Sequence, residues 1–485
     1  MTPLFEAEVA GVRVPGEHYI GGERVGSREW FATISPIDSS VLAEVARGDA
    51  ETARLALDAA SEAFGAWVAL GLTGRAERLH RLAELIDSNV ERLAAVECAD
   101  MAMLLRSLRA RVIHRGAENF RNYADLAVAY AERDWRSKGT WNRVQRMPAG
   151  PVVVITPWNA PFMLSTWKIA PALAAGCTVV LKPAEWSPLS CSLLAGLAGE
   201  AGFPPGVLNV VQGIGEEVGA ALVADPRARR ISFTGSTQTA RQIGASAAAN
   251  VVPFTAELGG KNPLVVFADA DLDLAAERAA GQYDDAGQVC LSGTRLLVQE
   301  SVASAFLKRF HARVDEHVLG DPRDDRTTIS PMIHEDHIEL VDGFVQRARA
   351  SGQRIVRGGQ RGDGLFYEPT LIEPLSNDAE IVQDEVFGPV LTFQTFTSEE
   401  EAVALANSTR YGLAAIVFTS SLDRADRIGR AIRSGVVWVN TFLVRDLTAP
   451  FGGIGDSGIG REGGDYALDF YSDLKTLQIL EGSTR

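Results

Sequence analysis

From residue 151 onward, short apolar runs alternate with stretches of helical periodicity, and this alternation constrains the fold more than any other feature. The first four runs are PVVVI at 151–155, CTVVLK at 177–182, LNVV at 208–211 and ISFT at 231–234. Short buried strands separated by helices form parallel sheets that helices cover on both faces. The sequence therefore predicts a doubly wound α/β unit in this region.

The alternation resumes after Gly260, with four further apolar runs at 263–267, 295–299, 414–418 and 436–440. One hydrophobic core rarely serves a chain of 485 residues, because single cores stop growing at about 250–300 residues. We therefore expect a second α/β domain.

Helical periodicity dominates the first third of the chain. Its clearest apolar face follows Thr73, which we interpret as an N-cap, and comprises Leu79, Leu82, Leu85, Ile86, Val90 and Leu93. Two segments fit neither α/β unit: a polar, Arg-rich stretch at 130–148 and a tail at 469–480 whose end has strand character. Because an edge strand can pair with another chain, these segments are candidates for subunit contacts.

Composition argues against several classes of protein. Hydrophobic residues make up 46% of the chain and no apolar stretch is long enough to cross a bilayer, so we predict a globular protein without a membrane partner. The first twenty residues lack the apolar centre of a secretory signal, which predicts a cytoplasmic protein. The net charge of −15, without a basic run interleaved with aromatic residues, predicts no nucleic-acid partner.

Four cysteines without a CxxC pair predict free thiols rather than a disulfide framework. Cys290 lies in GQVCLSGTR, at 287–295, in a loop before a predicted strand. A lone cysteine is more often a small buried side chain than a nucleophile. ELGGKNP, at 257–263, places Glu257 before two glycines, where the backbone can approach a ligand closely. Alone, this glutamate fits a solvated surface position equally well.

TPWNAP, at 156–161, directly follows a predicted buried strand. Asn159 is thus expected at the carboxyl edge of the sheet, where α/β proteins bind ligands. Its amide can donate a hydrogen bond to a developing oxyanion, although an ordinary turn also suits Asn between two prolines.

Two further loops carry groups that suit a dinucleotide. Lys182 and Glu185 lie at the end of one predicted strand, and Gly235 and Ser236 lie at the start of a predicted helix. Amides at a helix N-terminus bind phosphate, and a carboxylate can accept both ribose hydroxyls. GIGEEVG at 213–219 has one residue too many for GxGxxG, so we interpret it as a tight turn into a helix.

Taken in order, PWN, KPAE, FTGS, ELGGKN, GQVC, EVFGP and PFGG resemble the aldehyde dehydrogenase superfamily, from about residue 20 to the carboxyl end. The resemblance implies a Rossmann-type NAD-binding domain, an α/β catalytic domain and a small β oligomerisation element that builds a homodimer or homotetramer. The implied NAD-binding domain comprises residues 1–128 and 149–258, the catalytic domain 259–456, and the oligomerisation element 129–148 and 457–485.

The resemblance also implies oxidation of an aldehyde to a carboxylic acid. Cys290 is then the nucleophile, with the Asn159 amide and the Cys290 N–H around the oxyanion. Glu257 is the base that activates water for thioester hydrolysis. Lys168 and Glu462 resemble the supporting proton-relay pair of the family.

In the family, positions matching Lys182 and Glu185 bind the adenosine ribose, Ser236 the pyrophosphate, and Glu385 the nicotinamide ribose. The other implied cofactor positions are Thr156, Pro157, Trp158, Gly215, Phe233, Gly235, Leu258 and Phe387. A carboxylate at Glu185 repels a 2′-phosphate, so NAD is favoured, with NADP left possible. We predict no metal site and interpret HEDH at 334–337 as a polar helix start.

The segments 440–453 and 114–120 are similar to the branch that oxidises 2-hydroxymuconic and 2-aminomuconic semialdehydes. Arg445 and Arg115 are then expected to bind the substrate carboxylate through paired hydrogen bonds. The alternative for Arg445 is an ion pair with Asp446.

The aromatic residues expected around the substrate are Trp167, Phe442 and Phe451. They fit a neutral aromatic or aliphatic aldehyde as well, which remains the alternative substrate class. Asp284 and Asp285 depart from the branch pattern and are expected to disfavour an anionic substrate. A catalytically silent NAD-binding protein is the remaining alternative, and the combination of Cys290, Glu257 and Asn159 argues against it.

Overall fold

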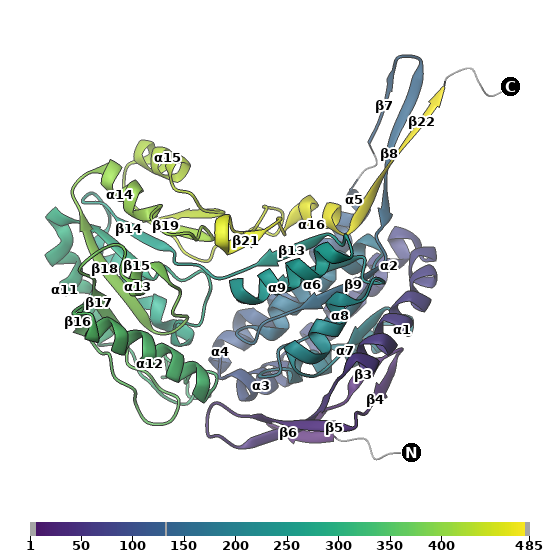
Figure 1. Ribbon diagram of the computed structural model, residues 1–485, viewed down its shortest axis with the longest axis horizontal. Helices are drawn as coiled ribbons and strands as arrows, with labels where there is room; N and C mark the ends of the chain where they lie inside the picture. The colour runs from purple at the N-terminus through teal and green to yellow at the C-terminus, as the bar shows by residue number, and fades with distance from the viewer. Residues whose placement is uncertain (1–5, 131–132, 481–485) are drawn as a thin grey trace.

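The computed structural model describes residues 6–130 and 133–480, so the outermost residues of the predicted domains, 1–5 and 481–485, lie outside the described residues. Two α/β lobes lie side by side, and a β ribbon projects from the first lobe (Figure 1). The predicted α/β fold with two doubly covered sheets is confirmed.

The first lobe contains an eight-stranded sheet in the order β21-β13-β12-β9-β10-β11-β3-β4. Its parallel centre consists of β9 (Pro151–Ile155), β10 (Thr178–Lys182), β11 (Leu208–Val210), β12 (Arg230–Thr234) and β13 (Phe254–Glu257). All four apolar runs predicted in this region form strands. The chain runs from β9 outward to β11 and then returns to β12 on the other side of β9. The carboxyl ends of β9 and β12 therefore flank a topological switch point, where open α/β sheets bind ligands.

Helices cover both faces of this sheet, because alternate strand residues face opposite sides. Val153 and Val180 pack against α1 (Ala50–Ala69), α8 (Ala220–Ala224) and α9 (Thr237–Ala249). Val152 and Val179 face the opposite layer, which contains α2 (Gly71–Ser88), α3 (Val90–Met101), α5 (Ile113–Ala129), α6 (Pro161–Ala175) and α7 (Leu189–Glu200).

The predicted N-cap at Thr73 is wrong. Helix α2 begins at Gly71, and Leu70 occupies the cap position without a side-chain hydrogen bond. Only Leu70 separates α1 from α2, so the sharp bend leaves no loop for a capping side chain. Leu79, Leu82 and Ile86 are buried as the periodicity predicts.

No single helix in the described part of the chain is long and apolar enough to cross a membrane. Helices α1 and α2 taken together are long and apolar enough for a membrane span, but the chain bends by 113° between them.

The second lobe contains a seven-stranded sheet in the order β16-β17-β18-β15-β14-β19-β20. The strands are β14 (Pro263–Val266), β15 (Arg295–Gln299), β16 (Arg354–Arg357), β17 (Thr370–Glu373), β18 (Val390–Phe396), β19 (Ala414–Phe418) and β20 (Val436–Val439). The four predicted apolar runs form β14, β15, β19 and β20. One face packs on α10 (Leu272–Ala280), α11 (Ala303–Val314) and α12 (Glu335–Ala350), the other on α14 (Glu399–Ala406) and α15 (Leu422–Ala431).

Short elements complete the two lobes. The strands near the N-terminus are β1 (Glu6–Val9), β2 (Val12–Pro15), β3 (His18–Ile20), β4 (Glu23–Val25), β5 (Glu29–Ile34) and β6 (Val41–Arg47). The other elements are α4 (Leu105–Ser107), η1 (Leu108–Val112), η2 (Gly215–Gly219), η3 (Gly281–Gly287), η4 (Glu300–Val302), α13 (Glu380–Gln383), η5 (Gly455–Ser457), β21 (Gly458–Ile459) and α16 (Gly464–Phe470). The turn at 213–219 leads into α8 through η2, as predicted.

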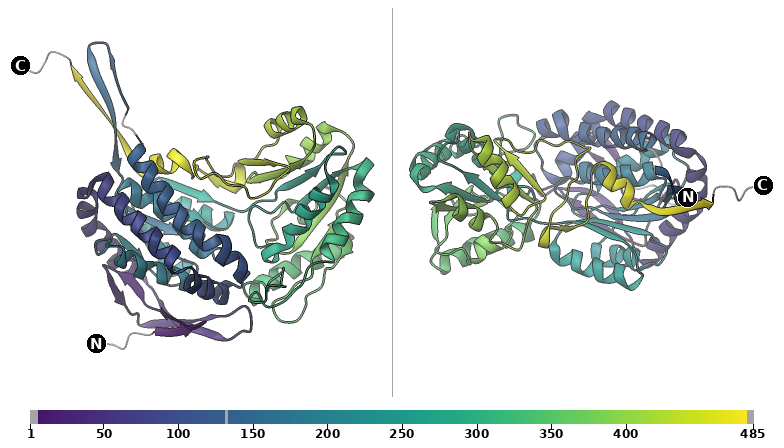
Figure 2. Two further views of the ribbon diagram at one scale, coloured as in Figure 1. Left: turned by 180° about the vertical axis from the view of Figure 1, so that it is seen from behind. Right: turned by 90° about the horizontal axis from the view of Figure 1, so that it is seen from above.

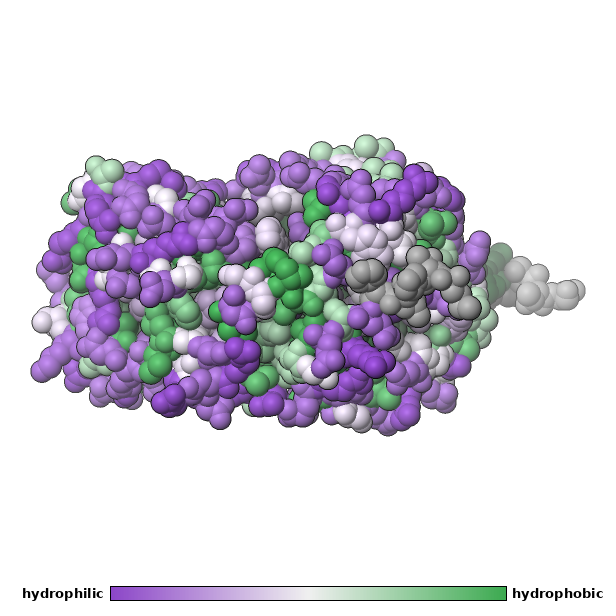
Figure 3. All heavy atoms as spheres, turned by 90° about the horizontal axis from the view of Figure 1, so that it is seen from below, coloured by the Kyte–Doolittle hydropathy of each residue, from purple (hydrophilic) through white to green (hydrophobic). Residues whose placement is uncertain are grey.

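The ribbon consists of β7 (Arg133–Ser137), β8 (Thr140–Pro148) and β22 (Ser472–Leu480), with β8 in the middle. It extends away from both lobes in two opposite views (Figures 1 and 2). Residues 457–471 do not join it, because β21 pairs with β13 and α16 packs against α6. Polar side chains cover most of the face that Figure 3 shows, and apolar side chains gather there in small groups.

Candidate active site

The loop that follows β9 meets the loop that carries Cys290. The side-chain amide of Asn159 donates a hydrogen bond to the carbonyl oxygen of Gln288, at 2.9 Å. Because β9 belongs to the first lobe and Gln288 to the second, this bond joins the lobes at the switch point of the first sheet. The structure thus places Asn159 against the loop that carries Cys290, at the residue two positions before the cysteine.

Cys290 lies between η3 and β15 with a partly exposed side chain, whereas the other three cysteines are buried. Asn262 holds this loop in place. Its amide nitrogen donates to the carbonyl oxygens of Cys290, at 2.8 Å, and Ser292, at 2.9 Å, and its amide oxygen accepts from the Ala414 N–H, at 3.0 Å. Sequence reasoning assigned no role to Asn262; the signal was its place directly after the glycine pair.

The surroundings of Cys290 oppose its ionisation. Burial, followed by the Glu385 and Glu257 carboxyls, raises the pKa of the Cys290 thiol to about 12. The Arg445 guanidinium and the backbone N–H of Cys290 act in the opposite direction. The resting thiol is therefore protonated at neutral pH, and a base together with the cation must generate the thiolate.

Glu257 ends β13 and is only 5% exposed. Within residues 6–130 and 133–480, neither of its carboxyl oxygens has a hydrogen-bond partner. Burial, and then the Glu462 carboxyl, raise the pKa of Glu257 well above its usual value, while Lys168 and Arg461 counteract this. A buried carboxyl group without a partner is costly, and such groups concentrate at functional sites.

Lys168 and Glu462 form a buried ion pair behind Glu257. The Lys168 ammonium donates to one Glu462 carboxyl oxygen and to Ser232 Oγ, the latter at 3.1 Å. The indole N–H of Trp167 donates to the other Glu462 oxygen, at 2.6 Å. Residues 294 positions apart in the chain thus meet as the resemblance implies.

The predicted cofactor residues gather around the ends of β10 and β12. Lys182 Nζ donates to Glu185 Oε2 at 2.7 Å, and the Thr156 N–H donates to the Lys182 carbonyl at 3.2 Å. Ser236 caps α9, since its hydroxyl accepts from the Thr239 N–H at 3.1 Å. Gly215 lies next to the Lys182 ammonium, and Gly235 packs against the Phe233 ring. The Leu258 N–H donates a hydrogen bond to the Ser457 carbonyl oxygen. Pro157 and Trp158 are half-buried.

Glu385 lies against the glycine pair that follows Glu257. Its carboxyl Oε1 accepts from the Gly260 N–H at 2.8 Å. A Cβ atom on Gly259 would lie 1.9 Å from Glu385 Oε2, so only glycine allows this approach. Burial raises the pKa of Glu385 to about 7, and the Gly260 N–H and Lys261 limit the rise.

Phe387 closes this side of the site. Its backbone has a φ of 56°, in the left-handed region, and its ring packs edge-on against Trp158 with 5.4 Å between ring centroids. The strained backbone turns the ring toward the first lobe.

Arg445 and Arg115 both lie over the indole of Trp167. The guanidinium carbon of Arg445 is 5.2 Å from that ring and 3.7 Å from the Phe451 ring centroid, and that of Arg115 is 5.8 Å from Trp167. Asp446 instead accepts hydrogen bonds from the backbone N–H and hydroxyl of Thr448, so the alternative pairing of Arg445 with Asp446 is wrong.

Neither guanidinium has a carboxylate partner among the described residues; Arg115 Nε donates to the Asn119 amide oxygen at 3.2 Å. Burial, followed by the Arg115 cation, lowers the pKa of Arg445 to about 10, and Glu257 and Cys290 limit the fall. Two neighbouring cations are thus held in an apolar aromatic setting, where an anion is the complementary ligand.

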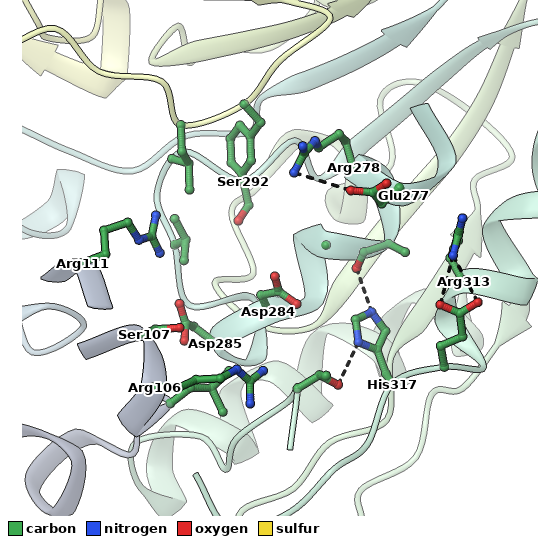
Figure 4. A pocket seen from close by; sticks show the side chains of 18 residues that line it. Arg106, Ser107, Arg111, Glu277, Arg278, Asp284, Asp285, Ser292, Arg313 and His317 are labelled. Atoms are coloured by element: carbon green, nitrogen blue, oxygen red, sulfur yellow. Dashed lines mark hydrogen bonds and ion pairs between the residues drawn. The ribbon is translucent and has the colours of Figure 1, made fainter. Parts of the chain in front are cut away.

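A cavity of about 520 Å³ opens onto the Cys290 loop, lined by Val289, Ser292 and Phe442. Arg106 and Arg111 face Asp284 and Asp285 across it (Figure 4).

Burial, and then Asp285, raise the pKa of Asp284 to about 7, and the two guanidiniums limit the rise. The two aspartates thus line this cavity together with two cations. Sequence reasoning missed Arg106 and Arg111. Arg111 belongs to the π-helical turn η1, a distortion that is common at functional sites but has no clear sequence signal.

The geometry defines a class of enzyme: an accessible cysteine, a buried base and an amide donor meet at the ligand-binding edge of a doubly wound sheet. Residues 24–477 match the model of the aldehyde dehydrogenase family. The chain therefore belongs to this family.

Similar proteins cover nearly the whole chain. (Z)-2-((N-methylformamido)methylene)-5-hydroxybutyrolactone dehydrogenase of Acinetobacter baylyi is 41% identical, over 95% of this chain and 96% of the relative. 2-Hydroxymuconic semialdehyde dehydrogenase of Pseudomonas sp. is 40% identical, over 96% of this chain and 99% of the relative. The indole-3-acetaldehyde dehydrogenase AldA of P. syringae, solved with NAD+ and IAA, is 38% identical with a TM-score of 0.95, over 97% of each chain.

Proposed function

We propose that the chain oxidises a carboxylate-bearing aldehyde to the acid with NAD, through a thiohemiacetal and a thioester on Cys290. The observation that carries this proposal is a pair of groups in one pocket: within residues 6–130 and 133–480, the Glu257 carboxyl has no hydrogen-bond partner and the Arg445 guanidinium has no carboxylate partner. Glu257 supplies the base that the chemistry needs, and Arg445 supplies the cation that the substrate needs.

Cys290 acts first. Glu257 takes the thiol proton, directly or through a water molecule, and Arg445 stabilises the resulting thiolate, because it is the cation that lowers the pKa of Cys290. The thiolate sulfur then adds to the aldehyde carbon, and the carbonyl oxygen becomes an oxyanion.

Asn159 and the backbone N–H of Cys290 receive that oxyanion. A side-chain amide has two N–H donors. One donor of Asn159 holds the Gln288 carbonyl, so the second is free to donate to the oxyanion. Removing one such donor typically costs about 10²–10³ in rate.

The cofactor groove fits a nicotinamide dinucleotide. Lys182 and Glu185 lie together at the end of β10, beside the Gly215 backbone, and Ser236 starts α9. A solved relative contains NAD+. A nicotinamide held in this groove would supply the hydride acceptor that oxidation of the Cys290 thiohemiacetal to the thioester requires. Glu185 excludes a 2′-phosphate by charge repulsion and favours NAD over NADP.

Glu257 acts again in hydrolysis. It takes a proton from the water that attacks the thioester, and Cys290 leaves as the thiolate. Lys168 and Glu462, which lie behind Glu257 and influence its pKa, provide a path for the proton away from the pocket. The products are the carboxylic acid and the regenerated thiolate.

The substrate class follows from the two guanidiniums. Arg445 and Arg115 suit an aldehyde that carries a carboxylate, of the kind named in the 2-hydroxymuconic semialdehyde relative. A neutral aldehyde packs against Trp167, Phe442 and Phe451 but leaves two partly buried guanidiniums without a carboxylate partner, which is unfavourable. We therefore favour the carboxylate-bearing aldehyde over the neutral one.

The ribbon is proposed to join subunits in a cytoplasmic homodimer or homotetramer. Strands β7, β8 and β22 project from the body and expose Trp135, Met147 and Leu474. An exposed edge strand with apolar side chains favours pairing with a second chain. Residues 1–128 with 149–258 remain the proposed NAD-binding domain, and residues 259–456 the proposed catalytic domain. Of the oligomerisation element expected at 129–148 and 457–485, the proposal keeps the ribbon strands, because residues 457–471 pack on the first lobe.

The direct test measures NADH formation at 340 nm with pairs of aldehydes that differ only in a terminal carboxylate. We expect NADH with both members of each pair and a higher kcat/KM for the carboxylated one. Absence of NADH with every aldehyde contradicts the enzymatic assignment. A preference for the neutral members contradicts only the substrate class.

A further inference from the structure

Five aromatic rings meet across the boundary between the two lobes. Trp158 and Trp186 come from loops of the first lobe, and His334, His337 and Phe387 come from the second. Trp186 stacks on His334 with ring centroids 3.9 Å apart and 20° between the ring planes. Trp158 lies 5.2 Å from His337 and 5.4 Å from Phe387, both edge-on. The stacked pair has the shortest centroid separation in this cluster.

Hydrogen bonds hold both sides of this contact. His334 is the N-cap of α12, since its Nδ1 accepts from the His337 N–H at 3.2 Å. His337 Nε2 bonds to the Phe387 carbonyl oxygen at 2.8 Å. On the first lobe, the Ser187 hydroxyl donates to the Trp158 carbonyl oxygen at 3.0 Å and so fixes the residue that follows Trp186. The two rings are therefore presented by ordered backbone on each side.

The position of the pair relates it to the cofactor groove. Trp186 directly follows Glu185, the carboxyl assigned to the adenosine ribose, and Phe387 lies two residues after Glu385, assigned to the nicotinamide ribose. The aromatic cluster thus includes residues close in the chain to the groups assigned to both ends of the dinucleotide. Trp186 is still 39% exposed, so the stacked pair lies at the outer edge of the cluster.

We propose that Trp186 and His334 form a latch across the mouth of the cofactor groove, and that opening this latch limits cofactor release. The proposal rests on the proposed function, because it uses the assigned cofactor residues. A contact between the lobes that lies beside the bound dinucleotide must part before the dinucleotide leaves. Both residues are positioning residues, since neither lies at the reacting atoms. Aromatic pairs of this kind stabilise a contact enough to change a rate by about two- to tenfold.

The experiment measures NADH dissociation by stopped flow, with the enzyme–NADH complex mixed into excess NAD and the loss of NADH fluorescence followed. Trp186→Ala and His334→Ser both remove the stack, and His334→Ser keeps a side chain that caps α12. We expect dissociation about three- to tenfold faster in each variant. In the double variant we expect no further acceleration, because the two residues act through one contact. Trp186→Phe retains a ring and is expected to lie between Trp186→Ala and the unchanged protein.

Trp135→Phe is the matched control, since Trp135 has a similar exposure of 41% but lies in the ribbon. Its NADH dissociation rate is expected to equal that of the unchanged protein. The quenching of tryptophan fluorescence on NAD binding provides a second readout, and Trp186→Phe is expected to lose more of it than Trp135→Phe.

Unchanged or slower NADH dissociation in both Trp186→Ala and His334→Ser overturns the latch, as does an acceleration that adds up in the double variant. If the unchanged protein does not bind NADH at all, the proposed function fails, and the two failures are thereby distinguished. His334→Ser tests the same contact from the other lobe, so faster NADH dissociation in Trp186→Ala without faster dissociation in His334→Ser overturns the latch as well.

Discussion

Polar side chains are paired in the cofactor groove, whereas key polar side chains in the reaction pocket lack such partners. In the groove, Lys182 pairs with Glu185, Ser236 caps α9, and Glu385 accepts the Gly260 N–H. In the pocket, Glu257 has no hydrogen-bond partner within the described chain, and Arg445 has no carboxylate partner there.

The polar groups of the groove are therefore satisfied within the folded chain, whereas the pocket keeps a carboxyl and a guanidinium available for the substrate. Unpaired buried groups destabilise a fold, so a pocket of this kind exchanges stability for reactivity. Substitutions in the two regions should differ accordingly. Pocket variants should lose rate and keep or gain stability, and groove variants should lose cofactor affinity.

The largest effect is expected at the nucleophile. Cys290→Ser should lower kcat by about 10⁴-fold or more, because a hydroxyl is a far weaker nucleophile in a site built for a thiolate. NADH production and NAD affinity are to be measured together, and the affinity should be nearly unchanged. Cys98→Ala, which alters a buried cysteine away from the site, should keep its activity. Comparable activity in Cys290→Ser would show that another residue attacks the aldehyde.

Glu257→Gln tests the unpaired base. Loss of a general base costs about 10²–10⁴ in rate, and we expect about 10³ in steady-state kcat. Pre-steady-state mixing should then show NADH formation ahead of acid release, because hydrolysis depends on the base most directly.

The same variant tests the cost of the unpaired carboxyl. Its melting temperature should equal or exceed that of the unchanged protein, since a neutral amide replaces a buried acid. A clearly lower melting temperature would contradict the idea that Glu257 is held at a cost to stability.

Arg445→Met tests the unpaired cation. The preference for a carboxylated aldehyde over its neutral analogue should fall about hundredfold, which corresponds to roughly 2–3 kcal/mol and lies in the range for a lost buried charge partner. Glu277→Gln is the control, because Glu277 lines the outer cavity and is already paired with Arg278. An equal loss in both variants would place the selectivity in the cavity rather than at Arg445.

Glu185→Gln tests the paired groove. The ratio of kcat/KM for NADP to that for NAD should rise about tenfold, because the repulsion of the 2′-phosphate is removed. The free enzyme should lose little stability, since the Lys182 to Glu185 pair is replaced by a hydrogen bond. An unchanged cofactor ratio would mean that another group excludes the phosphate.

The smallest expected effect is a displacement of the pH profile. The Arg445 cation lowers the pKa of both Cys290 and Glu257. Both groups act in the deprotonated form, so kcat/KM should rise with pH. Arg445→Met raises both pKa values and should move the rising limb toward higher pH. The profile is measured with a neutral aldehyde, so that substrate binding to Arg445 does not contribute. If the rising limb does not move, Arg445 does not assist thiolate formation.

The strands were predictable because their signal is local. PVVVI and AAIVF form strands that are covered on both faces of a parallel sheet. Such strands need apolar side chains at nearly every position, so a continuous apolar run in the sequence predicts them. The Thr73 cap failed because the start of α2 depends on the bend after α1, which is a tertiary feature. Strand β18 was missed although its sequence VLTFQTF carries the same local signal. Arg106 and Arg111 were not linked to the site because no local pattern marks them.

Glu257 and Glu385 show which properties of a carboxyl group the sequence could predict and which it could not. The sequence by itself determined that both are glutamates beside glycine-rich or strand-ending motifs, and that a cysteine loop lies between them in the chain. Only the tertiary structure decided that Glu385 receives the Gly260 N–H, 125 residues away, while Glu257 receives no partner. The chemical role of a carboxyl group depends on which donors surround it, and those donors come from distant parts of the chain that only folding brings together.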